Sequence, residues 1–281
     1  MSPQPPPVKC ILFDVGGVLV VSPMQAILDY ELANSIPPGF VNFAISRSGP
    51  TGAWSLIETG QIPLDDAFFA TFKTDLTNPA LWAEYWIRHT TKEKSAAPSR
   101  SNVPPVPDID AKRLFWTMMK MSRAPDRDMY PALLKLRASG RFTLAALSNT
   151  VAYPPGVVDA DGVPFSAELA HPAGSPEEKV REMKQNFEVF VSSAHVGMRK
   201  PDPRIYEYAV GEMNRVRRGE GKGEVRMEEV VFIDDIGQNL KGARELGMQT
   251  VKVTLGKNRE AVKELEKLTG LSLLDDGRSK L

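Results

Sequence analysis

Polar residues that suit phosphoryl chemistry follow four short apolar runs of the chain. Asp14 comes directly after the first run, and Ser148-Asn149 after the second. Lys200 lies beyond the third run, and the acidic pair Asp234-Asp235 follows the fourth. In an open α/β sheet, ligands bind at the carboxyl ends of the parallel strands. If the four runs are such strands, these side chains converge at one edge of a sheet.

The chemistry that this set could perform is phosphoryl transfer. A carboxylate such as that of Asp14 can attack phosphorus and form a covalent aspartyl-phosphate. Asp234 and Asp235 can hold a hard divalent cation, and Mg²⁺ usually takes one or two carboxylates together with water and phosphate oxygens. The cation and Lys200 would offset the charge of Asp14 and of an anionic substrate, so that the two anions can approach.

Further residues in the same positions could bind the phosphate. The Ser148 hydroxyl and the Asn149 amide could donate hydrogen bonds to the phosphoryl oxygens. Gly16 and Gly17 would allow backbone amides to approach the phosphate closely. The sequence therefore predicts a phosphate-binding site around the ends of the first two strands.

Each of these motifs also has an ordinary structural interpretation. An aspartate at a strand end, such as Asp14, often caps a helix, and Ser148-Asn149-Thr150 could form a plain turn or a cap. Lys200 alone would be a solvated surface charge. Asp234-Asp235 is harder to explain in this way, because two adjacent carboxylates after an apolar strand repel each other unless a cation or donors lie between them. The order of all four motifs favours function.

The elements that would position these residues alternate between strands and helices. The strands are short and β-branched or aromatic, and glycines stand where helix C-caps would fall, which predicts a doubly wound α/β, mainly parallel sheet of the Rossmann-like type. The expected strands are Lys9–Phe13, Thr143–Leu147, Val189–Ser192, Val230–Ile233 and Thr250–Val253, and the expected helices are Met129–Ser139, Pro203–Val216, Asn239–Leu246 and Arg259–Thr269.

A long segment interrupts this alternation. Residues 22–125 hold all four tryptophans, look mainly helical and are too long for a simple connection, so we expect an inserted helical cap subdomain whose aromatic residues form its own core. The α/β core would then comprise residues 8–21 and 126–274, with flexible tails at 1–7 and 275–281. Two irregular inserts, 95–107 and 151–175, are expected to be loops, the second within the core.

The composition is that of an ordinary soluble, intracellular globular protein. Lys plus Arg equals Asp plus Glu at 35 each, so the net charge gives no reason to expect a nucleic acid or a membrane surface as partner. The single cysteine, Cys10, excludes an intramolecular disulfide and fits a reducing compartment. The histidines His89, His171 and His195 share no metal-ligand spacing and are expected to be surface or packing residues.

The four motifs in this order resemble the haloacid dehalogenase superfamily, and more narrowly the N-terminal phosphatase domain of soluble epoxide hydrolase. They also resemble the similar N-terminal domain of some multi-domain acyl-CoA dehydrogenase family members. The residues that carry the resemblance are Phe13–Leu19, Leu147–Thr150, Val196–Tyr206, Val231–Leu240 and Ala261–Gly270.

The resemblance implies a role for each site residue. Asp14 would be the nucleophile and a Mg²⁺ ligand, the Gly16 carbonyl a second ligand, and Asp235 a third with Asp234 close by. Lys200 would neutralise charge and Asn239 would support the loop. Ser148 and Asn149 would bind the phosphate, and the cap would select a small substrate, for which the aromatic residues suggest a lipid-like or isoprenoid phosphate or diphosphate.

One departure from the family pattern keeps alternatives open. Most phosphatases of the family carry a second aspartate two residues after the nucleophile as general acid and base, and this position is Gly16 here. A metal-independent dehalogenase also uses an aspartate nucleophile and a lysine, and it needs no acid at Gly16. A non-catalytic binding or regulatory protein that has kept the fold is the third alternative.

The last three residues give an address. Ser279-Lys280-Leu281 at the C-terminus matches the peroxisomal import signal, which a dedicated import receptor reads. The sequence therefore predicts a peroxisomal protein, and a cytoplasmic one if this ending is a chance match.

Overall fold

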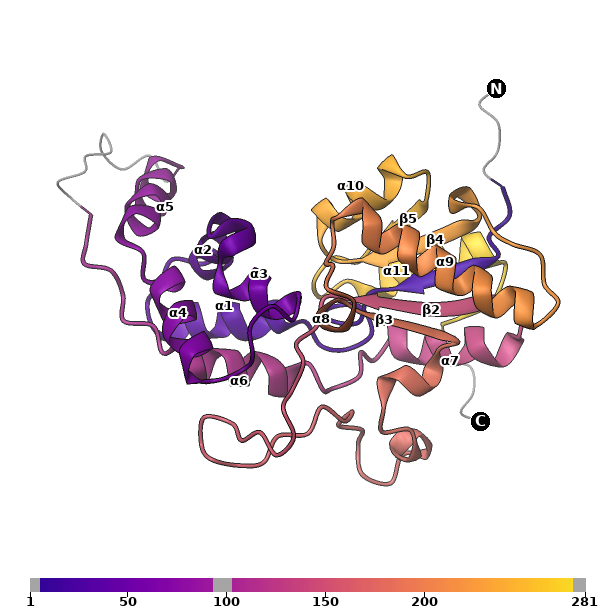
Figure 1. Ribbon diagram of the computed structural model, residues 1–281, viewed down its shortest axis with the longest axis horizontal. Helices are drawn as coiled ribbons and strands as arrows, with labels where there is room; N and C mark the ends of the chain where they lie inside the picture. Colours follow the sequence, from indigo (N-terminus) through magenta and orange to yellow (C-terminus); the bar gives the residue numbers. More distant parts are fainter. Residues whose placement is uncertain (1–5, 93–102, 275–281) are drawn as a thin grey trace. The chain divides into compact units, whose positions relative to one another are not determined.

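The computed structural model describes residues 6–92 and 103–274, and they form two compact units (Figure 1). Within these residues, the α/β unit comprises 6–22, 122–150 and 167–274. The helical unit comprises the described part of Pro23–Met121 together with Val151–Ser166. The chain thus enters the helical unit twice.

The α/β unit is built on one parallel sheet. The described strands are β1 (Cys10–Phe13), β2 (Thr143–Ser148), β3 (Val189–Ser192), β4 (Val230–Asp234) and β5 (Gln249–Lys252). They lie in the order β3-β2-β1-β4-β5, and every neighbouring pair is parallel. The central strands are buried at every residue, as their continuous apolar sequences require in a sheet covered on both faces. This confirms the predicted α/β fold class.

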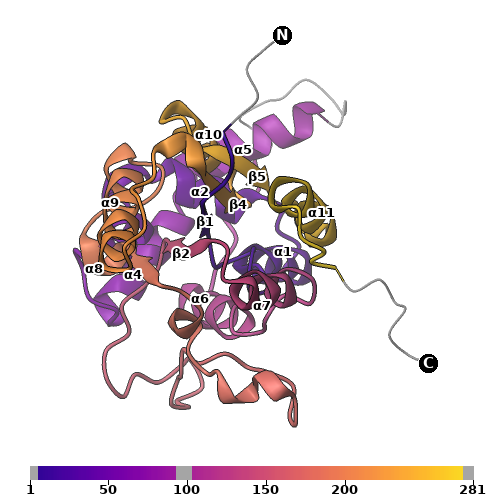
Figure 2. The same cartoon turned by 90° about the vertical axis from the view of Figure 1, so that its right-hand side faces the viewer.

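Helices cover both faces of the sheet. Side chains of β1 alternate, so that Ile11 and Phe13 pack with α7 (Met129–Ser139) and α11 (Asn258–Thr269), while Cys10 and Leu12 face the opposite layer. That layer consists of α9 (Pro203–Gly219) and α10 (Gly237–Glu245). Figure 2 shows the two layers on either side of the strands. Shorter elements of this unit are α8 (Ser193–Val196), η3 (Pro176–Lys179), η4 (Met183–Asn186) and η5 (Met227–Glu229).

The helical unit has a core of its own, rich in aromatic side chains. Phe68 stacks on Phe72 with ring centroids 5.5 Å apart, and Phe115 meets Trp116 edge to face at 5.2 Å. Such stacked and edge-on contacts are the arrangements that aromatic rings prefer in cores. The elements are α1 (Pro23–Ala33), α2 (Phe40–Arg47), η1 (Gly49–Thr51), α3 (Ala53–Glu58), α4 (Asp66–Leu76), α5 (Pro79–Lys92) and α6 (Ala111–Met121).

The second insert departs from the expected division of the chain. We predicted all of residues 151–175 as a loop of the α/β core, whereas Val151–Ser166 belongs to the helical unit. The reason is aromatic packing: the Phe165 ring lies 5.0 Å from Trp116 and 4.9 Å from Tyr153. The helical segment also begins after Ser22 and ends at Met121, slightly inside the predicted limits 22–125.

Several sequence predictions fall on residues outside the described part of the chain. These are residues 1–5 and 275–281 of the predicted tails, including the Ser279-Lys280-Leu281 signal, and residues 95–102 of the first insert. Within the predicted N-terminal tail, the Pro6 carbonyl accepts a hydrogen bond from Gln249 at 3.1 Å. Among the described residues, no helix combines the length and the apolar character that crossing a membrane requires.

Candidate active site

Three carboxylates meet at the carboxyl edge of the sheet. Asp14 follows β1, and Asp234 and Asp235 lie at the end of the neighbouring strand β4. One carboxylate oxygen from each residue can be chosen so that all three lie within 4.8 Å of one another. Asp14 is 6% exposed and Asp234 is fully buried, so this is not a solvated acidic surface.

A buried lysine bridges two of these carboxylates. The Lys200 side chain is fully buried, and its Nζ lies 2.9 Å from Asp14 Oδ1 and 2.7 Å from Asp234 Oδ2. One lysine against three carboxylates leaves an excess of negative charge in the cluster. Truncating a buried partner of this kind would leave an uncompensated charge, which is strongly unfavourable.

The ionisation of the cluster reflects that excess. Burial raises the pKa of Asp14 well above its usual range, repulsion from Asp234 and Asp235 adds to the rise, and Lys200 opposes it. Burial, followed by repulsion from Asp234, raises the pKa of Asp235 to about 7. For Lys200, burial alone would lower the pKa, but attraction to Asp14 and Asp234 outweighs it and the pKa is raised. A cluster in which carboxylate oxygens outnumber the neighbouring cationic groups is a suitable site for a hard divalent cation.

Asp234 is held in one orientation by the loop that follows it. The Asn239 side-chain amide donates to both carboxylate oxygens at 3.1 and 3.0 Å, and the Ile236 amide donates to Oδ1 at 2.7 Å. Tyr206 donates to the Asn239 carbonyl at 2.8 Å. Asn239 therefore lies where the family resemblance put it. The contact of Tyr206 with this loop was not predicted, because a tyrosine within a helical sequence pattern indicates only a residue of the hydrophobic core.

The turn after β1 brings Asp14 and Asp235 together. The Val15 amide donates to Asp14 Oδ1 at 2.7 Å, and Gly16 pairs in a short bridge with Val20. Gly17 has φ +77°, and a Cβ there would lie 2.2 Å from Asp235 Oδ2. Glycine is thus required at position 17 both by the backbone and by the approach of Asp235.

The Gly17 amide does not have the role that we expected. It donates to the Val20 carbonyl at 3.1 Å within the turn, whereas the sequence suggested a contact with phosphate. The Ser22 hydroxyl hydrogen-bonds the Asp235 carboxylate, a contact with no signal in the sequence, since Ser22 was assigned to the start of the cap.

The residues after β2 divide their roles. Ser148 ends β2 and is 4% exposed. The side-chain amide of Asn149 donates to the Lys200 carbonyl at 3.2 Å, and its Oδ1 accepts from the Lys200 amide at 2.9 Å. This reciprocal pair engages the side-chain amide, so the predicted phosphate contact of Asn149 is left to its backbone amide. The pair fixes the backbone of the lysine that reaches Asp14.

Comparison with known proteins shows the family to which the chain belongs. The model of the haloacid dehalogenase-like hydrolases matches residues 8–247. The chain belongs to this hydrolase family. That match, which covers most of both units, confirms the family to which the four motifs pointed.

The individual relatives share only about a quarter of their aligned residues with this chain. The chain is 27% identical over 269 residues to "Bifunctional epoxide hydrolase 2" of Sus scrofa, which covers 95% of this chain and 40% of the relative. It is 27% identical over 265 residues to "Acyl-CoA dehydrogenase family member 10" of Mus musculus, covering 94% of this chain and 19% of the relative. The chain therefore spans less than half the length of these relatives. A HAD family enzyme of Bacteroides thetaiotaomicron in a magnesium complex is 19% identical, with 90% of this chain and 96% of that chain covered and a TM-score of 0.46.

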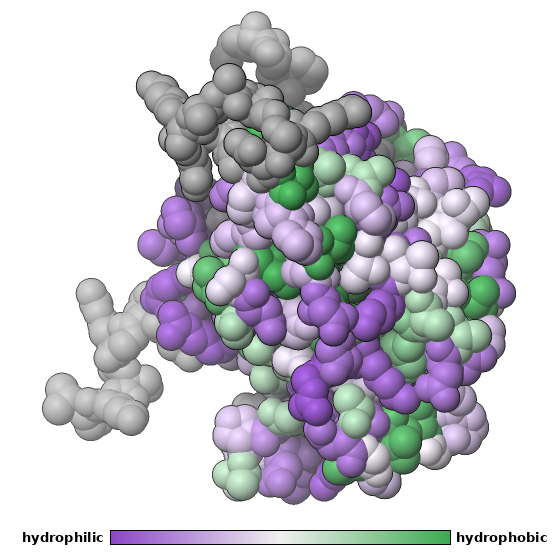
Figure 3. Space-filling model, turned by 90° about the vertical axis from the view of Figure 1, so that its left-hand side faces the viewer, coloured by the Kyte–Doolittle hydropathy of each residue, from purple (hydrophilic) through white to green (hydrophobic). Residues whose placement is uncertain are grey.

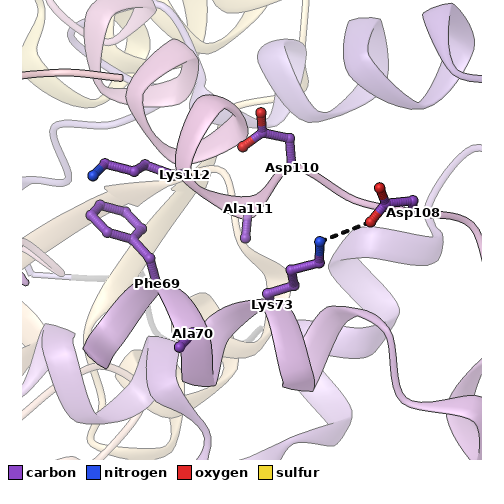
Figure 4. Close-up of a pocket in the computed structure, with 7 residues that line it drawn as sticks. All are labelled: Phe69, Ala70, Lys73, Asp108, Asp110, Ala111 and Lys112. Carbon is purple, nitrogen blue, oxygen red and sulfur yellow. Dashed lines mark ion pairs between the residues drawn. The ribbon is translucent and has the colours of Figure 1, made fainter. Parts of the chain in front are cut away.

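A separate hollow lies on the helical unit. It has a volume of about 340 Å³ and is lined by Phe69, Ala70, Lys73, Asp108, Asp110, Ala111 and Lys112 (Figure 4). Lys73 and Asp108 form an ion pair across it at 2.8 Å. The charges of its two lysines and two aspartates cancel, and its lining includes none of the predicted site residues.

Proposed function

We propose that this hydrolase is a magnesium-dependent phosphatase that acts through an aspartyl-phosphate on Asp14. The observation that carries the proposal is the buried excess of carboxylate over lysine charge around that residue. A metal-free site relieves this excess by keeping protons on the carboxylates, as the raised pKa values of Asp14 and Asp235 indicate, whereas a bound cation would let them ionise. Asp14, Asp235 and Asp234 supply the oxygens for Mg²⁺, and the Gly16 carbonyl is proposed as a further ligand.

The reaction that these residues support has two steps. Asp14 attacks phosphorus, the bond from phosphorus to the leaving oxygen breaks, and that oxygen departs with the electron pair. Water then attacks phosphorus, the bond to Asp14 breaks, and the carboxylate and inorganic phosphate are released. When bound, Mg²⁺ supplies positive charge that stabilises the phosphoryl oxygens.

The protein's own groups orient both steps. Val15 and Lys200 hold Oδ1 of Asp14, which fixes the rotation of the carboxylate. Lys200 offsets negative charge as substrate and nucleophile approach, and the Ser148 hydroxyl with the backbone amide of Asn149 is proposed to bind the transferring oxygens. Because Gly16 carries no acid, the departing oxygen takes its proton from water.

The proposed substrate is a small phosphate or diphosphate with an apolar part, such as a lipid-like or isoprenoid phosphate. Two large apolar side chains are exposed after strands whose carboxyl ends lie at the same edge of the sheet as the acidic cluster. Ile236 follows Asp235 directly and is 39% exposed, and Leu255 comes three residues after β5 and is 49% exposed. On the face shown in Figure 3, the coloured hydrophilic and hydrophobic residues are intermixed. Exposed apolar side chains at the edge of the sheet that carries the reacting groups favour an apolar leaving group over a sugar.

A metal-independent dehalogenase is the second candidate. The contact of Lys200 with Asp14 favours it, since a lysine beside the nucleophile also suits halide displacement, and Gly16 removes no group that this reaction needs. Against it stands Asp235, because Asp234 pairs with Lys200 with or without a metal, whereas the second carboxylate adds only repulsion to a metal-free site. The departure at Gly16 also leaves a non-catalytic member of the family as a third candidate.

A phosphate-release screen separates the three candidates. Aryl, sugar, lipid and isoprenoid phosphates would be tested with Mg²⁺, with EDTA, and with Asp14→Asn as the matched control. The phosphatase predicts release that EDTA stops and excess Mg²⁺ restores. Turnover of a 2-haloacid that is indifferent to EDTA would favour the dehalogenase. Absence of any turnover by the intact chain would favour the non-catalytic protein.

A further inference from the structure

The loop after β2 lies beside the carboxyl end of β3. Ser148 and Ser192 are direct partners in the parallel register of these two strands. Two residues later, at Thr150, the chain leaves the α/β unit. The proposed phosphate-binding residues Ser148 and Asn149 thus lie within the last three positions before a change of unit, where a loop needs side-chain contacts to hold its geometry.

Three hydroxyl residues provide such contacts. The Thr150 amide donates to Ser193 Oγ at 2.8 Å, and Ser193 Oγ donates to the Thr150 carbonyl at 3.4 Å. Thr150 Oγ1 lies 2.5 Å from Ser192 Oγ, which in turn lies 2.7 Å from Nδ1 of His195. Ser193 is fully buried. We call Thr150, Ser192 and Ser193 the hydroxyl cluster.

The opposite end of this region is fixed as well. Asn149 holds both backbone groups of Lys200 through its side chain. The loop of residues 148–150 is therefore tied to the segment from Ser192 to Lys200 by several side-chain hydrogen bonds. Its backbone and the lysine at Asp14 are consequently held as one piece.

We propose that the hydroxyl cluster is a set of positioning residues that holds the phosphate-binding loop at the distance from Lys200 that phosphate requires. This inference rests on the proposed function, because it takes Ser148 and Asn149 as phosphate donors. Preorganised donors bind an anion without reorganisation at the moment of binding, so loosening the loop weakens the anion's binding. These donors contact phosphoryl oxygens in ground state and transition state alike, so the loss appears in KM and not in kcat.

A purely structural role for the cluster makes a different prediction. Loss of stability reduces the fraction of folded enzyme, which lowers the apparent kcat and leaves KM unchanged. Thr269 offers the matched control in the same unit, because its buried hydroxyl donates to the Leu265 carbonyl at 2.7 Å within α11 and touches none of the loop. Thr269→Val therefore removes a comparable hydrogen bond away from the site.

The experiment compares Thr150→Val, Thr150→Ser, Ser192→Ala and Thr269→Val with the unaltered chain. Binding of inorganic phosphate in the presence of Mg²⁺ is measured by calorimetry, and KM and kcat are measured with p-nitrophenyl phosphate. A hydrogen bond of this kind contributes about a factor of ten or less. Thr150→Val and Ser192→Ala are expected to weaken phosphate binding and raise KM by about 3- to 10-fold with kcat within about twofold. Thr150→Ser, which keeps the hydroxyl, is expected to rescue both values.

The outcomes are distinct. Unchanged phosphate affinity and KM in Thr150→Val, or an equal change in Thr269→Val, would overturn the positioning role. Phosphate binding that depends on Thr150 without any turnover by the intact chain would refute the proposed phosphatase and support the positioning role. An intact chain that neither binds phosphate nor releases it would overturn both.

Discussion

Replacing Asp235 by asparagine tests the charge excess at the site directly. The amide has nearly the shape of the carboxylate, so it keeps the fit against Gly17 and can still hydrogen-bond Ser22. It removes one of the three negative charges. We therefore expect Asp235→Asn to make the metal-free protein more stable while it loses its response to Mg²⁺.

The size of the effect follows from the pKa of Asp235, which is raised from 3.8 to about 7. The folded state keeps the proton up to a pH of about 7, whereas the unfolded chain loses it near 3.8, so raising the pH through this window lowers the free energy of unfolding. Roughly three pKa units at 1.36 kcal/mol each correspond to about 4 kcal/mol at pH 8. At pH 5 only about a third of this window has been crossed, so the loss of stability there is well under half of that at pH 8.

Urea unfolding in EDTA measures this gain at both pH values. The free energy of unfolding of Asp235→Asn should exceed that of the original chain by up to about 4 kcal/mol at pH 8 and by less than half as much at pH 5. Adding Mg²⁺ at pH 8 should stabilise the original chain and leave the variant unchanged. Glu245→Gln, at a side chain that is 67% exposed in the same unit, is the control and should show neither effect. A variant no more stable than the original at pH 8, or equally stabilised at both pH values, would refute the reasoning.

Three further predictions concern the reaction and the turn. Asp14→Asn should reduce turnover by more than about a hundredfold with the fold intact, as circular dichroism would check, since the amide is a poor nucleophile; retention of a larger rate contradicts the covalent mechanism. Because Gly16 supplies no acid, and such help is worth roughly 10²–10⁴ in rate, the rate of aspartyl-phosphate formation from graded aryl phosphates should fall steeply as the leaving-group pKa rises; a flat dependence means that another group donates the proton. Gly17→Ala should abolish Mg²⁺-induced stabilisation in a thermal shift assay, because its Cβ would lie 2.2 Å from Asp235 Oδ2 at a φ of +77°; a normal Mg²⁺ response in this variant would show that the turn can yield.

The sequence predicts the sheet well because the strands are buried on both faces. The run Val230–Ile233 has no polar residue, so its boundaries are visible, and the same holds for Thr143–Leu147 except at its first residue. Strand ends in a parallel sheet share an edge, which is why Asp14 and Asp234 could be brought together without coordinates.

The missed features are those that depend on partners distant in the sequence. Pro and Gly in residues 151–166 indicate a loop, and nothing local reveals that Phe165 packs on Trp116. The sequence also does not reveal that the side chain of Asn149 bonds the backbone of Lys200, because the two segments are about 50 residues apart. Local pattern predicts which residues reach the edge of the sheet, and long-range packing decides what each one contacts there.

The double entry of the chain into the helical unit limits how this enzyme can be re-engineered. A helical unit that is a single insert can be exchanged by replacing one segment of the chain. Here, a graft that replaced only Pro23–Met121 would leave Tyr153 and Phe165 without the Trp116 ring on which they pack. The transplantable module is therefore two segments, Pro23–Met121 with Val151–Ser166, and a chimera that moves both should express as a soluble protein where the single-segment graft aggregates.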